Sequence, residues 1–321
     1  MEHGHESVCQ YVKLTIRKTM RRQIIVMFCG LFLLPLPAAF AEAPPAAVNR
    51  GALFKVQQAG HTLYLFGTIH VGAPDFYPLE PVVTRALHEA GALALEIDPA
   101  GDPRAAARAV LKYGMDAPGS TAPADCRQAL APRVSPLLQK YGIPLEAAAP
   151  MKPWMLASVL AIGEFSTLGY RPDLAVDTYL SQQAKQRLIP VVELESMESQ
   201  LALFGAMTPG EQCRFLEDSV ESIEDQEQKE EARQIADAWR TADTAAFERL
   251  AAKAATDPSF AAQFMQKVLL DGRNPKLADG IAKLLKQEKS SLAAIGVLHL
   301  AGTQSVPDLL RKKGLKVERI Y

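Results

Sequence analysis

The chain has 321 residues, a formal net charge of −1 and four cysteines. A nearly neutral chain without a stripe of Lys and Arg lacks the phosphate-neutralising charge on which nucleic-acid binding depends, so we expect no nucleic-acid partner. Because the cysteines do not cluster, a structural zinc knuckle and an iron–sulfur site are also excluded.

The N-terminus has the order of parts typical of a signal peptide. A basic stretch at residues 17–22 precedes an apolar run at residues 24–34, and small residues follow up to Ala41. The apolar run is about half of the ~20 residues that span a bilayer, so a permanent anchor is the weaker interpretation. We predict a signal peptide over residues 1–41, a mature protein without a membrane span, and a periplasmic or secreted location. Translation from Met20 instead of Met1 would leave a signal peptide of ordinary length.

The rest of the chain alternates short apolar strands with helical segments, which predicts a mixed α/β fold. Residues 42–50 are rich in Ala and Pro and are predicted to be a disordered lead-in. Strands are predicted at residues 53–57, 62–66, 92–97, 188–194, 291–296 and 315–320. Helices are predicted at residues 79–90, within 103–181 and 209–270, and at 274–287 and 304–313. Residues 51–321 are therefore predicted to form one domain, with a helical insert at about residues 100–285.

A short pattern, GxxH, occurs twice, at residues 67–70 and 296–299. Each copy closes an apolar strand and is followed by a helix and a second strand. Two such units at opposite ends of the domain predict a central sheet in which the units pair, with both histidines beyond the carboxyl ends of their strands. A glycine three residues before each histidine is what a bulge or a close backbone approach requires.

Acidic residues accompany these histidines. Glu96 and Asp98 are two residues apart on a predicted strand and should face the same side. Two imidazoles and a carboxylate at one point, from His70, His299 and Glu96, would form a site for a divalent first-row metal with a position open to water. A single histidine after a strand is more often a hydrogen-bonded structural residue, but the repeated motif favours a functional site. We therefore expect His70 and His299 to lie side by side, with Glu96 facing the same cleft.

Two cysteines, Cys126 and Cys213, remain after the predicted cleavage. An oxidising compartment would allow them to form a disulfide. Two unpaired buried thiols are the alternative, because their separation in the sequence says nothing about geometry.

Further blocks of sequence resemble the TraB/GumN family, which includes the Tiki metalloproteases. The resemblance rests on residues 65–70, 94–96, 176–180 with Ala184, 192–196 with Gln200, 273–274 and 296–302. It implies a sheet–helix fold related to erythromycin esterases and haem-binding ChaN-like proteins. It also implies metal-dependent peptide hydrolysis, with His70, Glu96 and His299 matching the central residues of the family.

The resemblance also marks three further residues. It implies a role for Glu195 as a metal ligand or base, for Arg273 as an oxyanion or carboxylate clamp, and for Asp177 as the partner that orients one of the catalytic groups. Each has an alternative interpretation: Asp177 could interact with a helix N-terminus, and Arg273 could form a surface pair with Asp271.

The function predicted from these patterns is that of a metal-dependent hydrolase acting on a peptide or protein substrate. A divalent ion, with Mn, Co and Zn as candidates, would polarise a carbonyl group and activate water, and a second carboxylate would take the proton. The sequence contains neither the HExxH pattern of zincins nor the G-x-S-x-G pattern of serine hydrolases. The alternatives are a haem- or metal-binding module without catalysis and an exported interaction protein whose site has lost activity. Substrate, metal identity and oligomeric state stay open.

Overall fold

The computed structural model describes residues 49–117 and 124–321. These residues belong to one compact unit. The predicted signal peptide and nearly all of the predicted lead-in lie outside the described residues.

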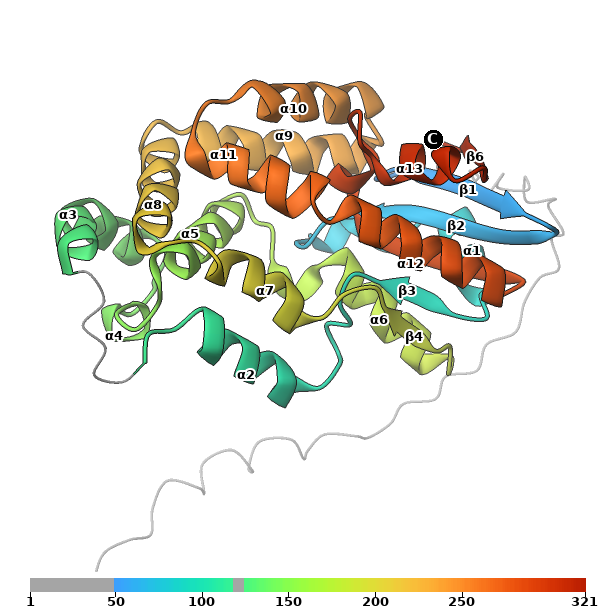
Figure 1. Cartoon of the computed structure of the whole chain (residues 1–321), viewed down its shortest axis with the longest axis horizontal. Coiled ribbons are helices and arrows are strands. Elements are labelled where there is room, and N and C mark those ends of the chain that lie inside the picture. Colours follow the sequence, from blue (N-terminus) through green and yellow to red (C-terminus); the bar gives the residue numbers. More distant parts are fainter. Residues whose placement is uncertain (1–48, 118–123) are drawn as a thin grey trace, which may run out of the picture. The chain divides into compact units, whose positions relative to one another are not determined.

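Six strands form one mixed sheet in the order β4-β3-β5-β2-β1-β6 (Figure 1). Strand β1 is antiparallel to both of its neighbours, whereas β2, β5, β3 and β4 pair in parallel. The bounds are β1 Leu53–Gln58, β2 His61–Thr68, β3 Leu93–Leu95, β4 Val191–Glu193, β5 Ser290–Gly296 and β6 Lys316–Arg319. The predicted hairpin is β1 and β2, joined by the turn at Ala59 and Gly60.

The two GxxH units meet in this sheet as predicted. Strand β2 opens the first unit and β5 opens the second, and they lie side by side with Thr68 opposite Gly296. The second strands of the two units diverge, since β3 pairs with the far side of β5 and β6 pairs with β1. The carboxyl ends of β2, β5 and β3 therefore lie at one edge of the sheet, where both histidines follow.

Thirteen α-helices occur among the described residues. They are α1 Pro81–His88, α2 Pro103–Tyr113, α3 Ala124–Lys140, α4 Leu145–Ala148, α5 Pro153–Thr167, α6 Val176–Gln186, α7 Met197–Gly205, α8 Pro209–Glu224, α9 Glu227–Thr241, α10 Thr244–Thr256, α11 Phe260–Phe264, α12 Asn274–Gln287 and α13 Val306–Lys312. Short 3₁₀ turns lie at Pro74–Phe76, Pro172–Leu174 and Val297–Leu300, and a π-helical segment at Met265–Asp271.

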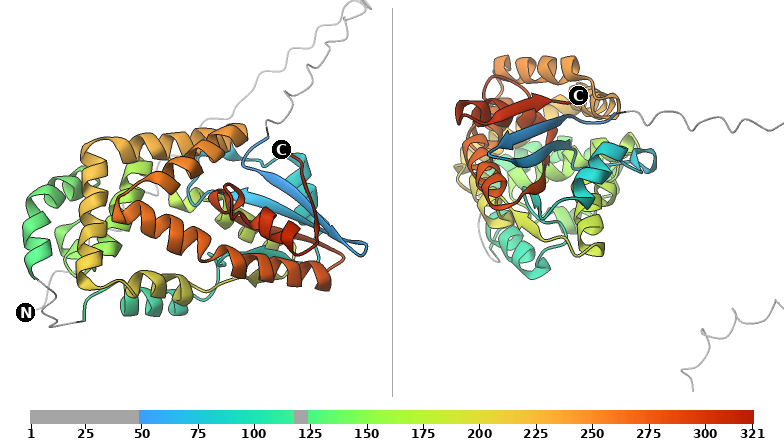
Figure 2. Two further views of the ribbon diagram at one scale, coloured as in Figure 1. Left: turned by 45° about the horizontal axis from the view of Figure 1, so that its top comes forward. Right: turned by 90° about the vertical axis from the view of Figure 1, so that its right-hand side faces the viewer.

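Helices cover both faces of the sheet. Helix α12 packs against β1, β2 and β5, and α13 packs against β6, while α1 contacts β5 and α6 contacts β3 and β4. Figure 2 shows these two groups on opposite faces of the sheet. The strands are correspondingly apolar on both sides: Leu63, Leu65 and Phe66 of β2 are fully buried. Burial on both faces is the condition that parallel strands require.

Part of the insert predicted at about residues 100–285 forms a second core, whereas β4 of the same range belongs to the central sheet and α6 and α12 pack against it. Helices α3, α5, α8 and α11 bury a cluster that includes Trp154, Leu160 and Leu216. In Figure 1 these helices lie beyond the end of the sheet at which the GxxH motifs stand. The insert therefore forms the surroundings of that edge.

A disulfide joins Cys126 of α3 to Cys213 of α8, with a Cα–Cα distance of 5.9 Å. The prediction of a disulfide is thus confirmed, and the alternative of two unpaired thiols is not. No helix in residues 49–117 and 124–321 is long and apolar enough to cross a membrane.

Removing the disulfide should destabilise the helical insert. We expect the Cys126→Ser/Cys213→Ser variant of the mature chain to lose about 2–4 kcal/mol of unfolding free energy, because the crosslink restricts the unfolded chain. Urea unfolding with and without dithiothreitol measures this. The reductant should lower the midpoint of the wild type and leave that of the variant unchanged; an equal response of both proteins would contradict a stabilising crosslink.

Candidate functional site

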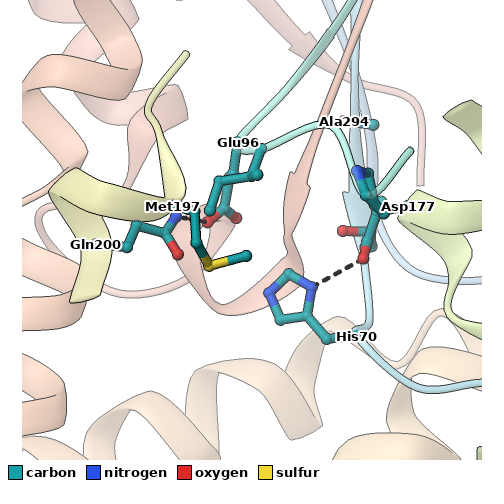
Figure 3. A pocket seen from close by; sticks show the side chains of 9 residues that line it. His70, Glu96, Asp177, Met197, Gln200 and Ala294 are labelled. Carbon is teal, nitrogen blue, oxygen red and sulfur yellow. Dashed lines mark hydrogen bonds and ion pairs between the residues drawn. The ribbon is translucent and has the colours of Figure 1, made fainter. Parts of the chain in front are cut away.

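A cavity of about 230 Å³ opens at the carboxyl ends of β2, β3 and β5 (Figure 3). Thr68 and Ala294, from the ends of two paired strands, line it together with the side chains that follow these strands. His70 stands two residues beyond β2, and Glu96 directly follows β3. Asp177, in the first turn of α6, lines the cavity as well.

The two histidines and Glu96 surround one small space next to Gly296. A Cβ atom added to Gly296 would lie 3.3 Å from Glu96 Oε1, 3.5 Å from His70 Nε2 and 3.7 Å from His299 Cδ2. The first motif uses its glycine for close packing too, since a Cβ on Gly67 would lie 2.8 Å from the side chain of Val297. The structure therefore brings together the three residues that the sequence grouped, and it leaves the space between them open because residue 296 has no side chain.

His70 is held by Asp177. The Nδ1–H of His70 donates to Asp177 Oδ2 at 3.1 Å, since a carboxylate can only accept. The negative charge of Asp177 raises the pKa of His70 above its ordinary value. The imidazole is 66% exposed, so solvent screens part of this attraction. The hydrogen bond leaves Nε2 free to face Gly296 and Glu96.

Asn274, the first residue of α12, orients the His299 ring. The Nδ2 group of Asn274 donates to the carbonyl oxygen of Gln304 at 2.8 Å, which turns its Oδ1 toward His299 Nδ1 at 2.5 Å. His299 Nδ1 must therefore carry the proton, and its Nε2 lone pair faces Glu96 Oε1 at 3.8 Å. Burial lowers the pKa of His299 to about 4, so the ring is neutral at pH 7.

Glu96 faces this lone pair as a carboxylate. Burial alone would raise the pKa of Glu96, but His299 when protonated, His70, Arg273 and the N–H of Gly296 together lower it to about 2. The N–H of Gly296 donates to Oε1 at 2.6 Å. At pH 7, where His299 is neutral, Arg273 and His70 supply the compensating charge. An acceptor nitrogen thus faces an acceptor oxygen, which is unfavourable unless a proton, a water or a cation lies between them.

Arg273 ties Glu96 to a second buried carboxylate. Its Nη2 contacts Glu96, and its Nε donates to Glu195 Oε2 at 2.9 Å. Gln200 donates to the same oxygen of Glu195 at 2.9 Å. Nη1 of Arg273 reaches the carbonyl oxygen of Leu269 in the π-helical segment. Arg273 therefore acts as a carboxylate clamp and not as a surface partner of Asp271.

Glu195, Arg273 and His299 are largely buried, and none of the three is among the residues that line the cavity. The predicted role of Glu195 as a base gains no support from this position, because Arg273 and Gln200 both donate hydrogen bonds to its Oε2. Asn274 and Gln200 were not predicted to act at the site. Only the sequence resemblance had marked them, since no local pattern shows that a helix N-terminus will meet a histidine 25 residues away.

The prediction that Glu96 and Asp98 share a face is wrong. Strand β3 ends at Leu95 and the chain bends at Glu96, so the alternation of side chains stops there. Glu96 turns toward the histidines, whereas Asp98 accepts a hydrogen bond from Ser181 and pairs with Lys185 at 2.9 Å.

The charges at the site suit a divalent cation, although the side chains are not already arranged as a set of metal ligands. Three carboxylates, those of Glu96, Glu195 and Asp177, stand against two positive charges, the Arg273 guanidinium and the protonated His70 ring, and an ion bound at His70 would displace the proton of that ring. Within residues 49–117 and 124–321, no three His, Cys, Asp or Glu side chains lie close enough to hold an ion as they stand. An ion next to Gly296 would therefore require these side chains to move from the positions that the structure gives them.

Comparison with known proteins identifies the family. The family model described as TraB/PrgY/gumN matches residues 52–319, which is nearly the whole described chain. The chain belongs to the TraB/PrgY/gumN family. It is also 27% identical over 256 residues to the uncharacterized protein YbaP of Escherichia coli (strain K12) and to that of Shigella flexneri, covering 77% of this chain and 87% of each relative. No solved structure matches the chain.

A buried hydroxyl in the cavity gives a prediction about stability. Thr68 is 1% exposed, and its Oγ1 has no hydrogen-bond partner among residues 49–117 and 124–321, which costs stability in the free protein. We expect Thr68→Val to leave the unfolding free energy unchanged or to raise it by up to about 1 kcal/mol in urea unfolding. As a contrast, Thr208→Val removes a hydroxyl that caps α8 and should lower it by about 1 kcal/mol. A comparable loss in Thr68→Val would mean that this hydroxyl is bonded within the protein.

Arg273 should be essential for folding as well as for the site. Arg273→Met would leave Glu96 and Glu195 buried without a cation, so we expect a loss of about 3–5 kcal/mol of unfolding free energy. Differential scanning calorimetry of both variants measures this. Arg233→Met removes an exposed arginine that pairs with Glu230 and should leave the stability nearly unchanged. Equal melting temperatures for the two variants would show that the buried clamp contributes little.

Proposed function

We propose that this protein is an exported, metal-dependent hydrolase of peptide bonds, with the ion held by His70, His299 and Glu96. The observation that carries this proposal is the matched orientation of the two imidazoles. Each has its Nδ1–H bonded to a polar side chain, Asp177 or Asn274, and each points its other edge toward Glu96. Histidine ligands in metalloproteins are typically oriented in this way by a second hydrogen bond.

The donor set fits a divalent first-row ion. Two imidazoles and one carboxylate suit Mn, Co or Zn, and the excess of carboxylates at the site would be neutralised by two positive charges. Oε2 of Glu96 is held by Arg273, so Oε1 is the oxygen that would serve as ligand. When bound, the ion would supply Lewis acidity that polarises a carbonyl group and activates water.

Residues of the chain would accept the proton, bind the substrate oxygen and keep the metal ligands in place. Asp177 orients His70 with Oδ2, while its Oδ1 is buried at the cavity wall and has no hydrogen-bond partner in the part of the chain that the structure describes. This arrangement suits Asp177, in place of Glu195, to accept the proton from the attacking water. The unpartnered hydroxyl of Thr68 could bond the substrate oxygen or water, and Arg273 keeps Glu96 in place.

Export is supported by the disulfide between Cys126 and Cys213, because disulfides form and persist in oxidising compartments. It agrees with the signal peptide predicted for residues 1–41. The alternative of a haem-binding module has less support. The cavity of about 230 Å³ at His70 lies below the roughly 300–1,000 Å³ of typical ligand pockets, and it would not enclose a porphyrin by itself.

Metal binding and hydrolysis should be lost together. Equilibrium dialysis of the mature protein against Mn²⁺, Co²⁺ or Zn²⁺ should give one bound ion, and the loaded protein should cleave fluorescein-labelled casein until EDTA is added. His70→Ala and His299→Ala should abolish both. Asn274→Ala should weaken metal binding by about 10- to 100-fold, because it removes only the group that orients His299.

The matched control is His88→Ala, which removes an exposed histidine of α1 outside the cavity and should change neither property. A wild type that binds none of the three ions, or a His299→Ala variant that binds them equally well, would overturn the metal site. A Soret band on addition of haem to the wild type, lost in His70→Ala, would favour the haem-binding alternative.

A further inference from the structure

A second and larger cavity adjoins the first. It has a volume of about 420 Å³ and shares three lining residues with the first cavity, Ile97, Pro99 and Met197. In Figure 3, Met197 lies beside Glu96 and Gln200, across the first cavity from Asp177. The first cavity, at about 230 Å³, has room for the reacting groups of a substrate but not for the residues that flank them. A longer substrate at the histidines would have to extend into adjoining space, which the second cavity provides.

The second cavity lies between α2 and the beginning of α7, and the loop that follows β3 lines it as well. On the α2 side its wall combines the small side chains of Ala105, Ala106 and Ala109 with the longer ones of Arg108 and Lys112. Small side chains leave the cavity wide enough to receive a long side chain from a ligand.

Acidic side chains outnumber basic ones on these walls. The charged lining residues are Asp98, Asp102, Glu193 and Glu198, against Arg108 and Lys112. Lys112 pairs with Glu198 at 2.8 Å, Arg108 approaches Asp102 at 3.8 Å, and Lys185, which is outside the lining, pairs with Asp98 at 2.9 Å. These pairs leave the lining with one carboxylate in excess, which favours a cationic ligand.

Glu193 is the carboxylate of this lining that has no basic partner within 4 Å in the part of the chain that the structure describes. It ends the edge strand β4, and its Oε1 accepts the backbone N–H of Asp98 at 2.9 Å. Glu193 is exposed, and this one bond orients its carboxylate without burying it. An oriented carboxylate without a cation, in a cavity continuous with the candidate site, is suited to bind Lys or Arg.

We propose that the second cavity binds the part of a peptide substrate that lies beside the scissile bond, and that Glu193 there pairs with a basic side chain. The inference rests on the proposed function in that it takes a peptide as the substrate. Binding in this cavity does not require the metal, however, so it is tested without catalysis.

The test measures binding of three fluorescein-labelled octapeptides to the mature protein in EDTA, by fluorescence anisotropy. The peptides are identical except for one central residue, which is Lys, norleucine or Glu. The wild type should bind the Lys peptide most tightly. Glu193→Gln should reduce the preference for Lys over norleucine by about two- to fivefold, as expected for one solvent-accessible ion pair, and Glu193→Lys should reverse the preference toward the Glu peptide.

Two matched controls, Glu318→Gln and Ala107→Trp, separate this effect from general changes in binding. Glu318→Gln alters an exposed carboxylate on the opposite edge strand, β6, and should leave the preference as in the wild type. Ala105→Trp fills the second cavity and should weaken binding of all three peptides. Ala107→Trp, on the same helix but outside the cavity lining, should not.

Equal binding of the three peptides by the wild type, no measurable binding of any, or a Lys preference that survives Glu193→Lys would overturn the inference. Cleavage of the same peptides is measured separately with added Mn²⁺, Co²⁺ or Zn²⁺. A protein that prefers the Lys peptide through Glu193 but cleaves none of the peptides would retain this binding site and reject the hydrolytic function.

Discussion

The parallel pairing of β2 with β5 is the constraint on which the rest of the structure depends. These strands come from opposite ends of the domain, and their register sets Thr68 against Gly296. Because both strands are buried on both faces, a shift of one residue would exchange the side chains that pack against the two layers of helices and would disrupt the packing of both layers, so the register is strongly specified. That register also fixes where the two GxxH motifs emerge, and it is the reason that two histidines more than 200 positions apart face a common space.

The buried charges form a second level of organisation on this edge. Glu96 is shared between a backbone N–H of the second motif and the guanidinium of Arg273, and Arg273 continues to Glu195. Each of these groups would be costly to bury alone. Their mutual satisfaction connects the ends of β3, β4 and β5 to α12, so the helical insert and the sheet are held together by the same groups that surround the candidate site.

Much of this arrangement follows from local sequence. Alternating apolar residues indicated the hairpin and strands β3 and β5, and the repeated GxxH pattern indicated that His70, His299 and Glu96 would converge. The bend after Leu95 was not indicated, because an apolar run does not show where pairing stops. The roles of Asn274 and Gln200 and the position of Glu193 depend on how helices and edge strands pack across long separations in the chain. Short-range propensity carries no information on such contacts.

The missing side chain of Gly296 bears on which residues the family can carry at this position. The space that its missing side chain leaves is bounded by a carboxylate and two imidazoles at van der Waals distance. Alanine would fit the backbone conformation there, since φ at Gly296 is −52°. Its methyl group would nevertheless occupy the space between these three side chains. A natural sequence with alanine at this position would therefore keep the fold and fill the space, so residue 296 distinguishes relatives in which this space is open from those in which it is closed.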